Sequence, residues 1–262
     1  MRYLIEFLNN PAKTYYPGNI ILCRLNIILQ QEKLIKDLRI VFEGRAKVKF
    51  RQGRTKIKAK QRFYGDIIGI SAELVLQPGQ HTFLFQTQLP NDLPPTFNGK
   101  YGFIEYKIYV FTKKSKVNGI FPFSVVSFPL QANLDEVIPL TITVGKEKKV
   151  YFPKQSIIRG SVITVEIKSS ELKKEKEKNI SVNLMKYFSY EVSGACSNYR
   201  KMEKFRVMKV PITTTNDYNG SFHIPMNVPK TLNFDPLELI KIRYVLKVYV
   251  NKQKFKFPIV IN

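Results

Sequence analysis

Basic side chains alternate with apolar ones along two adjacent segments of this 262-residue chain. A turn signal, Gln52-Gly53, separates the segments. Alternation with a period of two residues places the basic set on one face of a strand and the apolar set on the other. If the two strands pair, one sheet face is densely positive while the opposite face packs inward. The basic residues of this predicted hairpin, called the basic hairpin below, are Arg45, Lys47, Lys49, Arg51, Arg54, Lys56, Lys58, Lys60 and Arg62.

The chemistry that such a face can perform is the binding of anions. Like charges directly opposite one another destabilise a sheet by a few tenths of a kcal/mol per pair, so a real hairpin gains from an anionic partner. Near an anionic membrane leaflet each Lys or Arg contributes about 1 kcal/mol. The pattern therefore predicts docking onto acidic phospholipid or onto a phosphorylated protein tail. The alternative interpretation is a solvated outer face that only keeps the sheet from aggregating at its edge.

Nucleic acid is a weaker candidate for the same face. Aromatic residues lie near it, and stacking combined with phosphate contacts can bind single strands. However, Phe50 and Phe63 fall on the apolar alternate positions, which predicts that they belong to the core. Known nucleic-acid-binding signatures are not found in the sequence.

Catalytic and metal-binding patterns receive little support. The two histidines, His81 and His223, stand in comparable places in the two halves of the chain, and neither has a nucleophile or carboxylate at a recognised spacing. The two cysteines, Cys23 and Cys196, do not have metal-ligand spacing, and Cys23 is expected to be a small core residue. We therefore expect a protein that is not an enzyme and that carries neither a metal nor a cofactor.

The overall charge agrees with an anionic partner. The formal net charge is +23, from 43 Lys and Arg against 20 Asp and Glu, and the excess is spread over both halves of the chain. Such a field favours acidic partners, although general solubility would also explain it. The sequence lacks both a secretory signal pattern and an apolar run of the roughly 20 residues that span a bilayer. These observations predict a cytoplasmic protein.

Period-two patterns dominate the chain and predict an all-β fold. We expect separate strands over residues 38–43 and 46–50, and again over 56–63 and 70–76, with a loop over 32–38. The first strand is expected over residues 3–8. Many short strands at near-regular spacing, with almost no helical periodicity, are typical of antiparallel sandwiches.

The chain also contains an internal repeat. Tyr16-Pro17-Gly18 matches Phe152-Pro153-Lys154, the strand around Leu25 matches the one around Ile163, and Ile104-x-Tyr106 matches Ile242-x-Tyr244, all at nearly one spacing. The simplest explanation is two consecutive copies of one β-domain. Each copy would have roughly 130 residues, a common domain size. We therefore predict one domain over residues 1–131 and a second over 132–262.

Two passages resemble the arrestin family, specifically its α-arrestin branch. One is Tyr16-Pro17-Gly18 with the later run Leu38-Arg39-Ile40-Val41-Phe42-Glu43-Gly44-Arg45-Ala46. The other is Leu89-Pro90-Asn91-Asp92-Leu93-Pro94-Pro95-Thr96-Phe97-Asn98-Gly99-Lys100-Tyr101-Gly102-Phe103-Ile104-Glu105-Tyr106. The second half resembles the arrestin carboxy-terminal domain mainly in the order and position of its strands. The resemblance covers nearly the whole chain and implies two tandem immunoglobulin-like antiparallel β-sandwiches.

The resemblance also implies a function. It predicts a non-enzymatic adaptor that binds the cytoplasmic tails of membrane-protein cargo for endocytosis, ubiquitination or endosomal sorting, peripheral to the plasma membrane or to endosomes. Many α-arrestins recruit ubiquitin ligases through Pro-Pro-x-Tyr motifs, but here Pro94-Pro95 is followed by Thr96-Phe97, so recruitment through that motif is not expected. Two alternatives stay open: a retromer-type endosomal coat subunit, and a basic module that binds lipid or phosphate.

Overall fold

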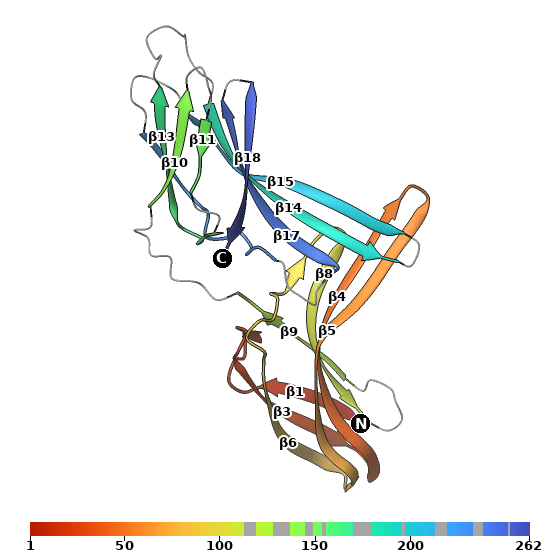
Figure 1. Cartoon of the computed structure of the whole chain (residues 1–262). Coiled ribbons are helices and arrows are strands. Elements are labelled where there is room, and N and C mark those ends of the chain that lie inside the picture. The colour runs from red at the N-terminus through yellow and green to blue at the C-terminus, as the bar shows by residue number, and fades with distance from the viewer. Residues whose placement is uncertain are drawn as a thin grey trace. The chain divides into compact units, whose positions relative to one another are not determined.

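The structure is a computed structural model that describes residues 1–112, 119–127, 137–144, 149–153, 156–169, 180–194, 197–212, 219–232, 238–250 and 252–262. Every regular element in these ranges is a β-strand (Figure 1). Within them there is accordingly no helix of the length and apolarity needed to cross a membrane.

The chain forms two compact units. The first comprises Met1–Phe128, Tyr190–Lys201 and Phe234–Ile240, and the second comprises Pro129–Ser189, Met202–Asn233 and Lys241–Asn262. The predicted boundary between residues 131 and 132 lies outside the described residues and stays a prediction.

The first sandwich contains a three-stranded and a six-stranded sheet. The three-stranded sheet has the order β1 (Arg2–Phe7), β3 (Ile20–Leu29), β6 (Gly79–Gln88). The six-stranded sheet has the order β2 (Thr14–Tyr15), β9 (Gly119–Val125), β8 (Gly102–Phe111), β4 (Lys33–Gln52), β5 (Thr55–Leu76), with β7 (Phe97–Asn98) also paired to β8. Phe42 and Phe85 join the two sheets at the centre of the core, with 6.1 Å between their ring centroids.

The second sandwich also has two sheets. One has the order β11 (Lys149–Tyr151), β10 (Val137–Val144), β13 (Val162–Ser169), β16 (Asn219–His223). The other has the order β12 (Ser156–Ile157), β18 (Gln253–Ile261), β17 (Ile240–Val250), β14 (Ile180–Ser193), β15 (Asn198–Ile212). Val165 and Leu246 are buried, one from each sheet. The predicted all-β fold of tandem sandwiches is confirmed, with the addition that β2–β9, β10–β13 and β12–β18 pair in parallel.

The two longest strands differ from the sequence prediction. β4 and β5 are each continuous, so the expected divisions at residues 44–45 and 64–69 and the expected loop at 32–38 are wrong. Register shifts at Leu38/Arg39 and Gly44/Arg45 absorb the interruptions of the alternating pattern without ending the strand. Such bulges bend a strand while the flanking ladder hydrogen bonds continue. Gly44 is needed at the second shift, because an added Cβ would lie 2.8 Å from the ring of Tyr106.

A turn before the long inner strand recurs in both units. Asn19 donates its backbone N–H to Tyr16 at 3.1 Å, and Ser161 donates to Ile158 at 3.2 Å. Gly18 and Gly160 have φ of 82° and 86°, which a type II turn requires at its third residue. The structural counterpart of Tyr16-Pro17-Gly18 is therefore residues 158–160, and the predicted match to Phe152-Pro153-Lys154 is wrong.

A second shared feature holds an extended segment against the closing strand of each unit. The hydroxyl of Tyr106 donates to the carbonyl oxygen of Pro94, and the hydroxyl of Tyr244 donates to that of Pro229 at 2.6 Å. Two residues after each proline a threonine Oγ1 accepts a backbone N–H from the closing strand. Thr96 accepts from Val125 at 2.9 Å, and Thr231 accepts from Ile261 at 2.8 Å. The predicted match of Tyr106 with Tyr244 is confirmed.

Replacing Tyr106 by Phe tests this anchor. The tyrosine is 1% exposed, and burial raises the pKa of its hydroxyl, so the group acts as a neutral donor. We expect Tyr106→Phe to lower the free energy of unfolding by about 1–3 kcal/mol, because a buried carbonyl loses its partner. Tyr109→Phe, on the same strand but half-exposed, should lower it by less than about 0.5 kcal/mol. Chemical denaturation measures both, and equal losses would contradict the prediction.

Candidate anion-binding hairpin

The basic hairpin is formed by β4 and β5, and its cations face one another across the ladder. Arg45 pairs with Arg62, Lys47 with Lys60, Lys49 with Lys58, and Arg51 with Lys56. Gly53 and Arg54 form the two-residue turn, and Gly53 has φ of 58°, which suits the first central residue of a hairpin turn. All nine predicted residues therefore lie together on one ribbon.

The opposite face of the ribbon is packed. Ala46, Val48, Phe50 and Ile57 are exposed by no more than 6%. Phe63 packs edge-to-face on Tyr106, with 5.8 Å between the ring centroids. The predicted division into a basic and an apolar face is confirmed. Because Phe50 and Phe63 are engaged in packing, they do not form a stacking platform for bases.

Carboxylates neutralise the part of the hairpin nearest the sheet. Glu43 lies 2.5 Å from Arg45 and 3.8 Å from Arg62. Glu105 bonds Lys47 at 2.7 Å and Lys107 at 2.6 Å. Burial alone would raise the pKa of Glu105, but the hydrogen bonds from Lys107 and Lys47 outweigh it and lower the pKa. These cations are therefore already paired.

The outer part of the hairpin has a different environment. We define the distal hairpin as Lys49, Arg51, Arg54, Lys56, Lys58 and Lys60, and none of these forms an ion pair with another described residue. Repulsion from Lys58 and then Lys49 lowers the pKa of Lys56. β8 pairs with β4 only as far as Val48, so beyond that residue β4 and β5 run to the turn as a two-stranded ribbon (Figure 1). An anion placed here would relieve the repulsion between the cations.

The histidines and cysteines considered as candidate site residues do not form a site among the described residues. His81 Nε2 lies 2.7 Å from the Gln77 carbonyl oxygen. His223 lies on β16 opposite Val162, and its counterpart in the first unit is Gln88, so the predicted equivalence of the two histidines is wrong. Cys23 is fully buried, as predicted, and burial raises the pKa of its thiol to about 12. Cys196 lies outside the described residues. A group of side chains suited to a metal ion is not found in the described part of the chain.

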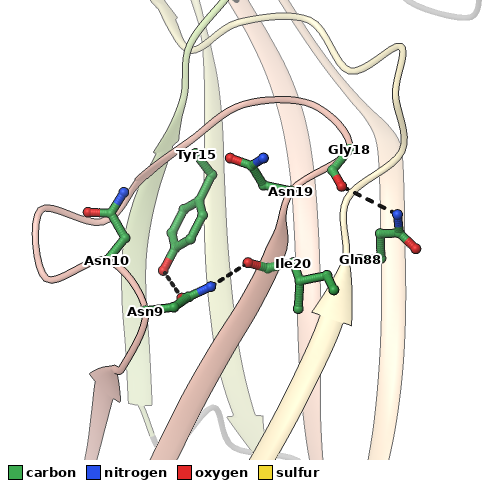
Figure 2. A pocket seen from close by; sticks show the side chains of 7 residues that line it. All are labelled: Asn9, Asn10, Tyr15, Gly18, Asn19, Ile20 and Gln88. Carbon is green, nitrogen blue, oxygen red and sulfur yellow. Dashed lines mark hydrogen bonds between the residues drawn. The ribbon is translucent and has the colours of Figure 1, made fainter.

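A polar pocket of about 470 Å³ lies beside the turn at Gly18 (Figure 2). Tyr15 donates its hydroxyl to Asn9 Oδ1 at 3.2 Å, and Asn9 Nδ2 donates to the Ile20 carbonyl at 2.7 Å. Figure 2 shows these two hydrogen bonds. Gln88 reaches the Gly18 carbonyl at 3.4 Å. These groups hydrogen-bond to one another and to the backbone, so they stabilise the loop that leads into β3. We assign no ligand to it.

Comparison with known proteins follows the division into two units. Residues 4–126 match the family model for the arrestin (or S-antigen) N-terminal domain, and residues 147–262 match that for the arrestin (or S-antigen) C-terminal domain. Human thioredoxin-interacting protein is 28% identical over 160 residues, which cover 54% of this chain and 39% of that protein. The chain thus spans well under half the length of this curated relative.

The register of the hairpin makes a prediction about stability. Lys58→Glu turns the Lys49–Lys58 pair from repulsive to attractive, so we expect stability to rise by a few tenths of a kcal/mol. The gain should shrink at high salt, because exposed charges are screened. Lys33→Glu is the matched control, since Lys33 is exposed on β4, the strand paired with that of Lys58, but lies opposite Leu76. Thermal unfolding at two salt concentrations measures both variants. A fall in the stability of Lys58→Glu below that of Lys33→Glu would contradict the register.

Proposed function

Because the chain belongs to the arrestin family, whose two domains its halves match in order, we propose that it is a non-enzymatic adaptor for membrane-protein cargo. In this role it binds the cytoplasmic tails of membrane proteins and directs these proteins to endocytosis, ubiquitination or endosomal sorting. The paired domain match over most of the chain is the observation that carries the proposal. Within residues 1–262, Pro94-Pro95 is followed by Thr96-Phe97 and so does not form a Pro-Pro-x-Tyr motif.

The edge strand β1 supports a role in tail binding. β1 stands at the end of the order β1-β3-β6, so one side of its backbone is not paired within that sheet. An extended peptide can add to such an edge as a further strand, held by main-chain hydrogen bonds. We therefore propose that an extended cargo tail adds to β1 in this way.

The distal hairpin supports a position at the membrane. Each Lys or Arg near an anionic leaflet contributes about 1 kcal/mol, so the six cations of the distal hairpin supply at most several kcal/mol. These cations lack carboxylate partners in the described structure, so they break no ion pair there when they bind lipid headgroups. We therefore propose that the ribbon touches the anionic cytoplasmic leaflet of the plasma membrane or of endosomes while cargo binds elsewhere.

Proximity labelling with the full chain in its native cell tests the adaptor role. We expect membrane proteins with cytoplasmic tails to be enriched, while gentle purification retains few of them, because adaptor contacts are transient. A stable complex of fixed stoichiometry would instead favour a retromer-type coat subunit. Labelling without enrichment of membrane proteins would overturn both assignments.

Sedimentation with vesicles tests the hairpin. Binding to vesicles containing phosphatidylserine should fall as salt rises and be absent on pure phosphatidylcholine. Changing Lys49, Lys56, Lys58 and Lys60 together to Glu should weaken binding at least about tenfold. The matched control changes the exposed Lys33, Lys204, Lys209 and Lys252 to Glu, which alters the net charge equally. Equal losses in the two variants would show that overall charge, and not the hairpin, governs binding.

A further inference from the structure

The outer face of the six-stranded sheet carries an apolar depression of about 590 Å³ that the basic hairpin adjoins. Its apolar lining residues are Val41 from β4, Ile67 from β5, Tyr109 and Phe111 from β8, and Ile120 from β9. Ile67 and Ile120 are 56% and 54% exposed. Large apolar side chains gathered on a solvent face mark a surface for binding more often than isolated ones do.

The strand register explains why these residues meet. Val41 lies opposite Ile67 on one side and opposite Tyr109 on the other, and Tyr109 lies opposite Ile120. The four side chains thus form one row across four strands, and Phe111 adds its ring 6.0 Å from that of Tyr109. A rigid row on a sheet needs little ordering when a ligand binds.

One glycine leaves space beside the row. Gly65 and Gly69 flank Ile67 at alternate positions of β5. The Arg62 guanidinium fills the space over Gly65, since an added Cβ there would collide with Arg62 Nη2. Space beside Gly69 is open, since an added Cβ there would meet no atom within 4 Å. A hollow of this kind receives a protruding apolar side chain and does not fit the flat surface of a bilayer.

The rim and its surroundings define the charge of the occupant. Cations line the hollow, namely Arg39, Arg45, Lys47, Arg62 and Lys107, against the single carboxylate Glu43. Beyond this rim the same strands lead to the distal hairpin, whose cations lack carboxylate partners among the described residues. From Val41 to Lys49 the distance along β4 is about 26 Å, or eight residues of extended chain. A second copy of this chain, at a net charge of +23, would be repelled from such a surface.

We propose that the apolar depression and the distal hairpin together bind a segment of a partner protein with apolar anchor residues followed by an acidic run. The anchors fill the hollow beside Ile67 and Ile120, and the acidic side chains extend along β4 and β5 towards Lys49 and Lys58. The order of the two surfaces fixes the direction of the segment, since the exposed apolar row takes the anchors and the cations of the distal hairpin take the acidic run. Peptide binding of this kind is separate from cargo routing and from lipid binding. It depends on the proposed adaptor role only in that a cargo or partner protein would supply the peptide.

Fluorescence anisotropy with three synthetic peptides tests the proposal on the full chain. The first carries Leu-Phe, a Gly-Ser spacer and a glutamate run, spanning about eight residues after the anchors to match β4 from Val41 to Lys49. The second lacks the Leu-Phe anchors, and the third has Gly-Ser in place of the glutamates. We expect the complete peptide to bind at least about tenfold more tightly than either part, because linked contacts act as one binding event.

Matched variants locate the binding. In the double variant Ile67→Ser and Ile120→Ser, the affinity for the complete peptide should fall to that for the peptide without anchors. Leu84→Ser is the control, since Leu84 is 63% exposed on β6 of the other sheet. Lys49→Glu with Lys58→Glu should remove the gain from the glutamates and leave the anchor contribution. Because the changed side chains are exposed, thermal unfolding should stay near that of the parent.

Each remaining outcome decides against the proposal. Equal losses for Leu84→Ser and the isoleucine variant would mean general stickiness, and unchanged binding in the isoleucine variant would mean that the depression is not used. If the isoleucine variant lost vesicle binding and kept peptide binding, the hollow would be a membrane contact. Failure of peptide binding with vesicle binding intact would overturn this inference alone and leave the lipid proposal standing.

Discussion

A hydrogen bond from a tyrosine hydroxyl to a proline carbonyl holds an extended segment against one sheet of each sandwich. In the first unit Tyr106 on β8 bonds Pro94, and two residues later Thr96 bonds the closing strand β9 at Val125. One short extended segment is thus held to two adjacent strands of the six-stranded sheet. Those two strands supply Tyr109, Phe111 and Ile120, so the surface proposed to bind an acidic peptide depends on the same hydrogen bonds. Tyr244, Pro229 and Thr231 repeat the arrangement in the second unit.

The basic hairpin shows how a sheet can hold an unfavourable arrangement of charges. Its four cation pairs repel across the ladder, yet β4 and β5 stay paired because Ala46, Val48, Phe50 and Ile57 are buried beneath them. Burial of each large apolar side chain contributes about 1.5–3 kcal/mol, which outweighs a few tenths for each like-charge pair. The apolar face therefore stabilises the ribbon although its outer face is densely charged. Glu43 and Glu105 form ion pairs with Arg45 and Lys47 and so offset part of that charge. Beyond Val48, where the pairing of β4 with β8 ends, the cations have no ion pair with a described carboxylate.

The cationic ribbon and the apolar hollow lie next to each other on β4 and β5, and each suits a different kind of partner. A protruding cationic ribbon suits a planar anionic surface, because long lysine side chains reach outward from both strands. The hollow between Ile67 and Ile120 suits a protruding side chain instead, because the space beside Gly69 on β5 is open. Both surfaces lie on β4 and β5, so a membrane and an acidic peptide would compete for Lys49 and Lys58. Such competition would couple the occupancy of one partner to that of the other.

The sequence by itself determined which face of each strand is basic or apolar, that the fold is all-β, and that the family is the arrestins. Side-chain alternation is local, and the string from Pro94 to Tyr106 can be read residue by residue. The tertiary structure alone decided which side chains face one another. Arg51 opposite Lys56, the row from Ile67 to Ile120, and the bulge at Gly44 that continues β4 all follow from the pairing of strands distant in the chain. A period of two residues specifies a face but not a neighbour, because the register is set by contacts on both sides of a strand and by its bulges. For the same reason the sequence matched Gly18 to the wrong turn and His81 to the wrong position, although it matched Tyr106 to Tyr244 correctly.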